Sequence, residues 1–225
     1  RRNTSMVFQN YALFANKTAK ENILERIKKA LATPTSIPFS KNEDDSASVY
    51  QPQQQDAAIE FAENFTKLQG IFSYCLNEKE LIDQIILLCK KKQWEKVCCD
   101  EEALQNLLQQ HTLNQAWHSN LSSCNVSITS CELLIARTGS IVMSSIQKNG
   151  RTASVYAPAH ICIAYTDQLV YDIKEGLDLL KKKYIKNFPS LITFATGPSR
   201  TADIEKTLVV GIHGPKEVYV FLVER

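Results

Sequence analysis

The chain has 225 residues, of which 44% are hydrophobic and 22% charged, and a formal net charge of +2 at pH 7. This composition is ordinary for a globular protein and allows one large α/β domain, or a domain with an extension. The small net charge and the lack of a recognisable motif argue against nucleic acid as a ligand. No apolar run approaches the roughly 18 residues that cross a bilayer, and residues 1–16 lack the apolar core of a signal peptide. We therefore expect a cytoplasmic protein that binds neither nucleic acid nor membrane.

Residues 1–55 are expected to form a helical arm followed by a polar linker. Apolar residues recur at helical spacing from Ala19 to Leu31. Thr33-Pro34 ends this pattern because the residue before a proline avoids the helical region. Residues 35–55 are rich in Pro, Asn, Asp, Ser and Gln, as linkers are. A helix this short is marginal in water, so it should pack on the body of the protein or on a partner.

Residues 56–225 are expected to form a single α/β domain. The first half alternates helices and strands, which predicts a mostly parallel sheet with helices on its faces. The expected elements are a helix over residues 56–69, a strand over 70–76, a helix from 77 to about 91, a short strand over 96–99 and a helix up to about 111.

The second half adds shorter strands and one predicted hairpin. Asn149-Gly150 separates the strand-like runs 139–145 and 152–156. This dipeptide is typical of a two-residue hairpin turn, in which both residues take positive φ. The other expected elements are strands over 126–128, 133–136, 160–165 and 218–223, and a helix over 173–185.

The stretch 190–207 combines a strand signal with a turn. Leu191 to Thr196 is apolar and β-branched, which predicts a buried strand, and Gly197-Pro198 breaks it. The small and acidic residues that follow are typical of a first helical turn. A strand, a Gly-containing turn and a helix start present free backbone N–H groups to an anion. A second break, Gly211 to Lys216, precedes the last strand.

Four motifs occur in order in the C-terminal half, and they resemble one known family. They are Thr138-Gly139-Ser140-Ile141-Val142, Ala157-Pro158-Ala159-His160-Ile161, Thr196-Gly197-Pro198-Ser199-Arg200-Thr201-Ala202-Asp203-Ile204-Glu205 and Gly211-Ile212-His213-Gly214-Pro215-Lys216. Together they resemble the LUD-domain family, in its lactate utilization protein C branch, over about residues 20–225. The resemblance implies a Rossmann-like α/β sheet of the sugar-phosphate isomerase and CoA-transferase (NagB/RpiA-like) superfamily, with an inserted β-hairpin region.

The resemblance also implies a part in the bacterial oxidation of L-lactate to pyruvate, beside partner proteins that carry iron–sulfur clusters. The seven cysteines of this chain include no C-x-x-C pair and no cluster-type spacing. We therefore expect reduced, buried thiols and no cluster or other cofactor on this chain. One alternative is a stand-alone enzyme or binding protein for a phosphorylated sugar or an acyl or CoA ligand, suggested by the strand, turn and helix start of the stretch 190–207 and by analogy of fold. Another is a regulatory module that uses the N-terminal arm on a partner.

A pocket for a small organic acid or another anion is expected at the motif residues. Arg137 stands where the family often has Glu, so a carboxylate nucleophile of the CoA-transferase type is missing. Arg137 either holds a carboxylate or phosphate bidentately or is an exposed strand-end arginine. The candidate ligand-binding residues are Arg137, Thr138, Gly139, Ser140, Gly197, Pro198, Ser199, Thr201 and Asp203.

Four residues are candidates for acid–base chemistry: His160, His213, Asp203 and Glu205. An imidazole titrates near neutral pH and can act as a general base. A ring that bonds backbone at a strand end or in a Gly-rich turn explains both histidines equally simply. Asp203 and Glu205 suit a first helical turn through the macrodipole, where they would also repel an anion. The histidines lack a suitably spaced carboxylate, so no metal site is expected.

Overall fold

The computed structural model describes residues 19–32, 52–53, 55–110, 117–118, 120–148, 152–204 and 207–225. The chain divides into two units, Arg1–Gln51 and Pro52–Arg225, and the second is called the body below. In the first unit, helix α1 covers Ala19–Leu31 as predicted, with exposed Ile23 and Leu24 side chains. Among the described residues, no helix is both long enough and apolar enough to cross a membrane.

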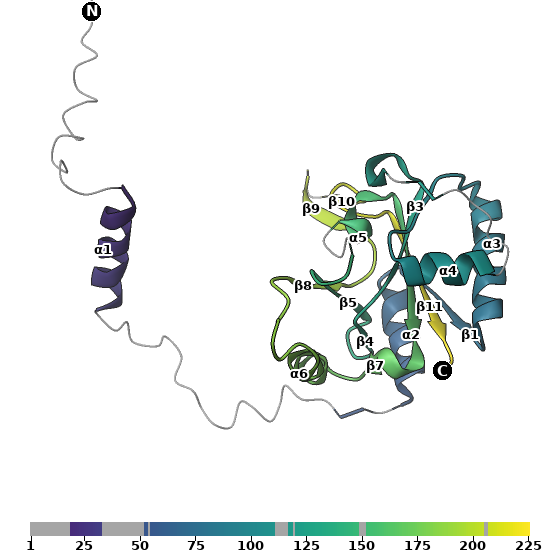
Figure 1. The fold of residues 1–225 in the computed structure, drawn as a ribbon, viewed down its shortest axis with the longest axis horizontal. Coiled ribbons are helices and arrows are strands. Elements are labelled where there is room, and N and C mark those ends of the chain that lie inside the picture. Colours follow the sequence, from purple (N-terminus) through teal and green to yellow (C-terminus); the bar gives the residue numbers. More distant parts are fainter. Residues whose placement is uncertain are drawn as a thin grey trace, which may run out of the picture. The chain divides into compact units, whose positions relative to one another are not determined.

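A five-stranded parallel sheet forms the centre of the body (Figure 1) and confirms the predicted parallel arrangement. Its strand order is β1-β11-β6-β3-β2. Strand β11, predicted only as the last strand, is an inner strand of this main sheet and lies between β1 and β6. The strands are β1 (Ile71–Cys75), β2 (Val97–Cys98), β3 (Val126–Ser130), β6 (Ala159–Tyr165) and β11 (Glu217–Val223).

One face of the main sheet is covered by α3 (Glu78–Lys92) and α4 (Glu102–Gln110). Asn77 caps the start of α3, because its side chain accepts a hydrogen bond from the Glu80 N–H at 2.9 Å. The two helices bury their apolar faces on the sheet. The side chains of this core include Leu81, Ile82, Ile85, Leu104, Leu108, Val126, Ile128, Ile161, Ile163 and Phe221.

The other face is covered by α2 (Ala57–Lys67) and by a second sheet of order β7-β4-β5-β8. Successive side chains of β4 and β5 point to opposite faces of the second sheet and so belong to two hydrophobic cores. Leu134 and Ile141 face α2 and the main sheet, whereas Leu133 and Val142 face α6. The second sheet thus lies between the main sheet and α6. The remaining bounds are β4 (Leu133–Ile135), β5 (Ser140–Ser144), β7 (Leu169–Val170), α6 (Ile173–Lys183) and β8 (Ile192–Ala195).

The predicted hairpin over 139–156 is wrong in its second strand, because Ala153–Tyr156 forms the short helix α5. Strand β5 pairs antiparallel with β4 on one side and β8 on the other. Both of its edges are occupied, so the run 152–156 has no edge to join. The hairpin of this region is instead β4–β5, and the Asn149-Gly150 turn lies outside the described residues.

The helix start predicted after Gly197-Pro198 is also wrong. Arg200–Ile204 forms strand β9, which pairs antiparallel with β10 (Thr207–Val210). The β-branched residues of both segments favour a strand once each has the other as a partner. The segment after Gly197-Pro198 therefore does not provide the helix N-terminus that was predicted to bind an anion. Glu205 lies outside the described residues, and the side chain of Asp203 is not described.

All seven cysteines are free and buried, as expected. Burial raises the pKa of the Cys89 thiol to about 11 and that of Cys99 to about 12, so both stay protonated at neutral pH. Within the described ranges, no group of three or more His, Cys, Asp or Glu side chains is arranged to hold a metal ion.

Candidate functional site

The Thr138–Ser140 motif forms the tight connection from β4 to β5, pressed against α2. Gly139 has φ +59°, and a Cβ there would lie 2.7 Å from the backbone nitrogen of Phe65 in α2. Only glycine fits this approach. One turn of the same helix holds the loop in place, because the Asn64 amide donates to the carbonyls of Ala136 and Arg137 at 3.1 Å each. The motif is thus fixed to the C-terminal half of α2.

Three hydroxyls form a chain at this loop. Thr138 Oγ1 lies 2.8 Å from Ser140 Oγ, which lies 2.8 Å from Thr196 Oγ1. The pairing of β5 with β8, which sets Ile141 opposite Ala195, brings Ser140 and Thr196 together. Ser140 is buried and Thr196 is exposed. The chain supplies uncharged donors and acceptors for a polar ligand.

The Gly197–Arg200 segment joins the end of α2 to the turn before β11. Gly197 has φ +79°, and a Cβ there would lie 2.7 Å from the carbonyl oxygen of Leu68, which also accepts a hydrogen bond from Arg200. The Ser199 N–H donates to Pro215 at 3.0 Å, and the Ser199 carbonyl accepts from Gly211 at 2.9 Å. Pro198 is buried. These motif residues make long-range backbone contacts.

All of these contacts lie at the amino edge of the main sheet. The Gly211–Lys216 turn directly precedes β11, and the Lys216 N–H donates to the carbonyl of Pro158, just before β6, at 2.8 Å. Ligands of open parallel sheets usually bind outside the carboxyl ends of the strands. At this edge the motif residues make contacts that stabilise the fold. Ligand binding by these residues stays a prediction.

The histidine candidates have different surroundings. His160 is buried, and its Nε2 lies 2.8 Å from Thr129 Oγ1. Burial lowers the pKa of His160 to about 4, so the ring is neutral at pH 7 and has no exposed nitrogen for a substrate. His213 is exposed in the Gly211–Lys216 turn, and Thr201 is half-buried on β9. The two histidines thus differ in their access to a ligand, because the ring of His160 is buried and His213 is exposed.

Arg137 pairs with a side chain of this chain. Its Nε lies 2.6 Å from Asp172 Oδ2, and the two side chains are 29% and 13% exposed. Asp172 also caps α6, where its Oδ1 accepts from the Lys174 N–H at 2.9 Å. The Lys174 N–H and then the Arg137 guanidinium lower the pKa of Asp172. Arg137 thus ties the motif loop to the start of α6.

We expect Arg137→Glu to destabilise the body by about 1–2 kcal/mol, because it sets a second carboxylate beside Asp172. Arg137→Gln, which removes the pair without adding a like charge, should cost about 1 kcal/mol or less. Urea denaturation at pH 7 measures both variants, and added salt should narrow the gap between them. Equal stabilities at low salt would contradict the pairing.

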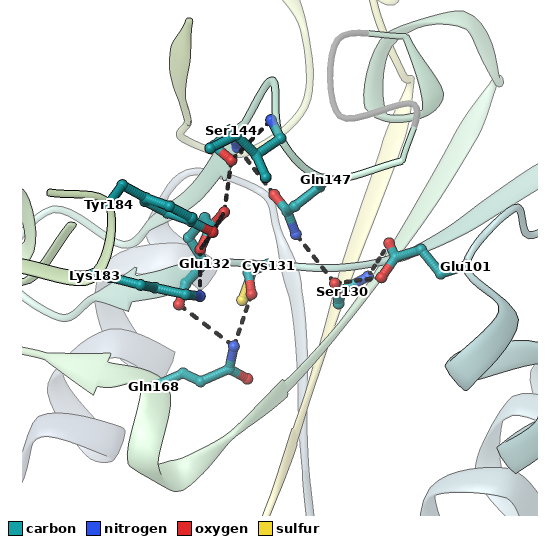
Figure 2. A network of polar contacts seen from close by, with 10 residues as sticks. Glu101, Ser130, Cys131, Glu132, Ser144, Gln147, Gln168, Lys183 and Tyr184 are labelled. Carbon is teal, nitrogen blue, oxygen red and sulfur yellow. Dashed lines mark hydrogen bonds and ion pairs between the residues drawn. The ribbon is translucent and has the colours of Figure 1, made fainter. Parts of the chain in front are cut away.

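A network of polar side chains, which was not predicted from the sequence, lies at the carboxyl edge of the main sheet (Figure 2). Glu101, just after β2, accepts hydrogen bonds from the backbone N–H and the hydroxyl of Ser130 at the end of β3. Gln147 bridges this pair to the second sheet, since its amide donates to Ser130 Oγ at 3.1 Å and accepts from the Ser144 N–H at 2.9 Å.

Glu132 is the buried centre of this network, and its residue is only 4% exposed. It accepts hydrogen bonds from Ser144 Oγ at 2.6 Å, Lys183 Nζ at 2.8 Å and the Tyr184 hydroxyl at 2.8 Å (Figure 2). Burial alone would raise the pKa of Glu132, but the bonds from Lys183, Ser144 and Tyr184 outweigh it and the pKa is lowered. Glu132 is therefore a fixed carboxylate. Its lone charge in an apolar run was the available sequence signal.

Comparison with known proteins finds one family and relatives that share one name. The model of the LUD domain family matches residues 58–223. Lactate utilization protein C of Bacillus subtilis is 36% identical over 104 residues, which are 45% of this chain and 43% of that protein. Its counterpart in Geobacillus sp. (strain WCH70) is 32% identical over 148 residues, 59% of this chain and 61% of that protein. The matches thus span about half the length of these curated relatives.

One solved structure supports the fold. The crystal structure of a DUF162 family protein from Deinococcus radiodurans superposes with a TM-score of 0.55 at 19% sequence identity. The match covers 76% of this chain and 99% of that one. At this identity the likeness shows the α/β fold alone.

Proposed function

Because this chain belongs to the LUD domain family, we propose that it is the cluster-free component of a bacterial iron–sulfur system that oxidises L-lactate to pyruvate. The observation that carries the proposal is the similarity to relatives named lactate utilization protein C, together with the family match over 58–223. The name of these relatives supports a role in lactate utilization. The oxidation releases two electrons and two protons per lactate; we assign acceptance of the electrons to clusters on partner proteins, and the protons pass to solvent.

The side chains of the body support a binding or assembly role within such a system. Buried thiols and a buried neutral His160 offer no redox or general-base group to a ligand. The exposed end of the Thr138–Ser140–Thr196 hydroxyl chain offers hydrogen bonds to the hydroxyl or carboxylate of a small organic acid. The competing assignment, a phosphorylated sugar or CoA ligand, drew its support from a helix start after Gly197, and that segment is a strand.

Genetic complementation tests the proposal. We expect the chain to restore growth on L-lactate in a Bacillus subtilis strain that lacks its own lactate utilization protein C. Iron–sulfur proteins of the host should then co-purify with the chain and be visible by their absorbance. A folded, well-expressed chain that neither restores growth nor retains iron–sulfur proteins would contradict the proposal.

A further inference from the structure

A groove of about 660 Å³ lies at the carboxyl edge of the main sheet, beside the first turns of α2. Its floor is apolar and consists of side chains from three elements: Ile59 and Ala62 of α2, Phe72 and Tyr74 of β1, and Leu169 of β7. Tyr74 stands near the end of β1, whereas the family motifs gather at the amino edge. The groove is thus distinct from the motif cluster, and its size is that of a binding site.

Strand β1 leaves an open edge beside this groove. In the part of the chain that the structure describes, β1 pairs with β11 alone. Its five residues, Ile71–Cys75, include no charge and no proline, which are two of the devices that protect edge strands from pairing. Large apolar side chains are exposed around it: Ile71 by 46%, Tyr74 by 40% and Ile59 by 54%. Such a combination marks an interaction surface.

The charge of the groove is acidic. Asp56 and Glu63 line it, and no Lys, Arg or His is among its lining residues within the described ranges. Local desolvation, then the carboxylates of Glu224 and Asp56, raise the pKa of the Tyr74 hydroxyl. Lys67 lies 3.9 Å from Glu63, but both side chains are more than half exposed, so this pair is weak and open to exchange.

We propose that an extended segment of a partner protein binds along β1 as an added strand. Backbone hydrogen bonds to the open edge would hold it, and pockets beside the edge would select its alternate side chains. On the face toward α2 the segment carries apolar side chains for the groove floor and lysine or arginine for Asp56 and Glu63. A second copy of this chain fits less well, because two-fold pairing of β1 would bring two acidic grooves together.

This inference goes beyond the proposed function, and its test does not involve lactate. The probe is a fluorescein-labelled octapeptide with lysine and valine alternating at the odd positions and threonine at the even ones. We expect the full-length chain to bind it in fluorescence anisotropy, and hydrogen exchange to slow at residues 71–75. A peptide with glutamate in place of lysine should bind about tenfold more weakly or not at all.

Variants with matched controls locate the contact. Glu63→Lys and Ile59→Ser should each weaken binding about tenfold. Asp178→Lys, at an exposed carboxylate that pairs with Lys181 on α6, and Ile185→Ser, at a side chain 81% exposed, should bind the peptide as well as the parent does. Failure of the lysine peptide to bind, equal binding of the glutamate peptide, or protection that leaves β1 unchanged would overturn the proposal. So would a dimer, seen by sedimentation, that Ile59→Ser dissociates.

Discussion

Gly139→Ala is expected to lower the free energy of unfolding by about 3 kcal/mol. The residue has φ +59°, which alanine adopts only at a cost, and its Cβ would lie 2.7 Å from Phe65 N and 2.9 Å from the carbonyl carbon of Asn64. These are backbone atoms of α2, so no side-chain rotation relieves the clash. The helix must move, and the two hydrogen bonds from the Asn64 amide must lengthen. Urea denaturation measures the loss.

The matched control is Gly176→Ala in α6. A Cβ there meets its nearest neighbours, among them the Ile135 side chain, at 3.5 Å, which is ordinary contact. Alanine also favours the helix interior over glycine, so this variant should be as stable as the parent or gain about 0.5–1 kcal/mol. If both alanine variants lost the same stability, the close approach of the motif loop to α2 would not be the cause.

Glu132→Ala is expected to cost about 3 kcal/mol at neutral pH, because it leaves the hydroxyls of Ser144 and Tyr184 and the ammonium of Lys183 without their common acceptor. This loss of stability is at the lower end of the range for buried ion pairs, because the Lys183 side chain is 58% exposed. Asp178→Ala removes an exposed carboxylate that pairs with Lys181 and should change stability by less than about 0.5 kcal/mol.

The dependence on pH distinguishes the charge of Glu132 from its shape. The pKa of Glu132 is lowered in the folded protein from its ordinary value of 4.5. The carboxylate therefore stabilises the fold above that value, and the contribution is lost as pH falls through the folded pKa. The gap in stability between the parent and Glu132→Gln should be full at pH 7 and shrink below about pH 4. A gap that is constant with pH would mean that packing alone accounts for it.

Local signals in the sequence predicted much of the fold. The helices predicted over 56–69 and from 77 to about 91, and the strand predicted over 160–165, depend on neighbours within a few residues, and each is present. Alternation of strands and helices was enough to predict a parallel sheet. The seven buried cysteines also followed from their apolar surroundings.

The predictions that failed depend on distant partners. Arg200–Ile204 has the small and acidic residues of a helix start, yet it forms β9 because β10 pairs with it and Gly211 donates to the Ser199 carbonyl. Residues 153–156 are β-branched in part, yet β4 and β8 already occupy both sides of β5. Pairing partners of this kind cannot be read from a single window of sequence.

The candidate site could also be predicted only in part from the sequence. The motif residues were found, but their position at the amino edge follows from α2, β6 and β11 meeting there. The network around Glu132 was missed because its partners Lys183 and Tyr184 come 51 and 52 residues later. A single acidic residue in an apolar run indicates that the folded protein supplies a polar partner, but it does not indicate which residue that partner is.

The place of β11 between two strands that precede it in the chain has a consequence for how the protein is made. Tyr219 pairs with Ile71 on one side and Ile161 on the other, so the two ladders that join β1 and β6 through β11 require residues 217–223. A ribosome releases β1 and β6 well before β11, and until then their facing edges have no partner. Such a nascent chain is open to mispairing and is a natural client of chaperones. Loss of residues 217–223 would separate β1 from the three strands β6, β3 and β2.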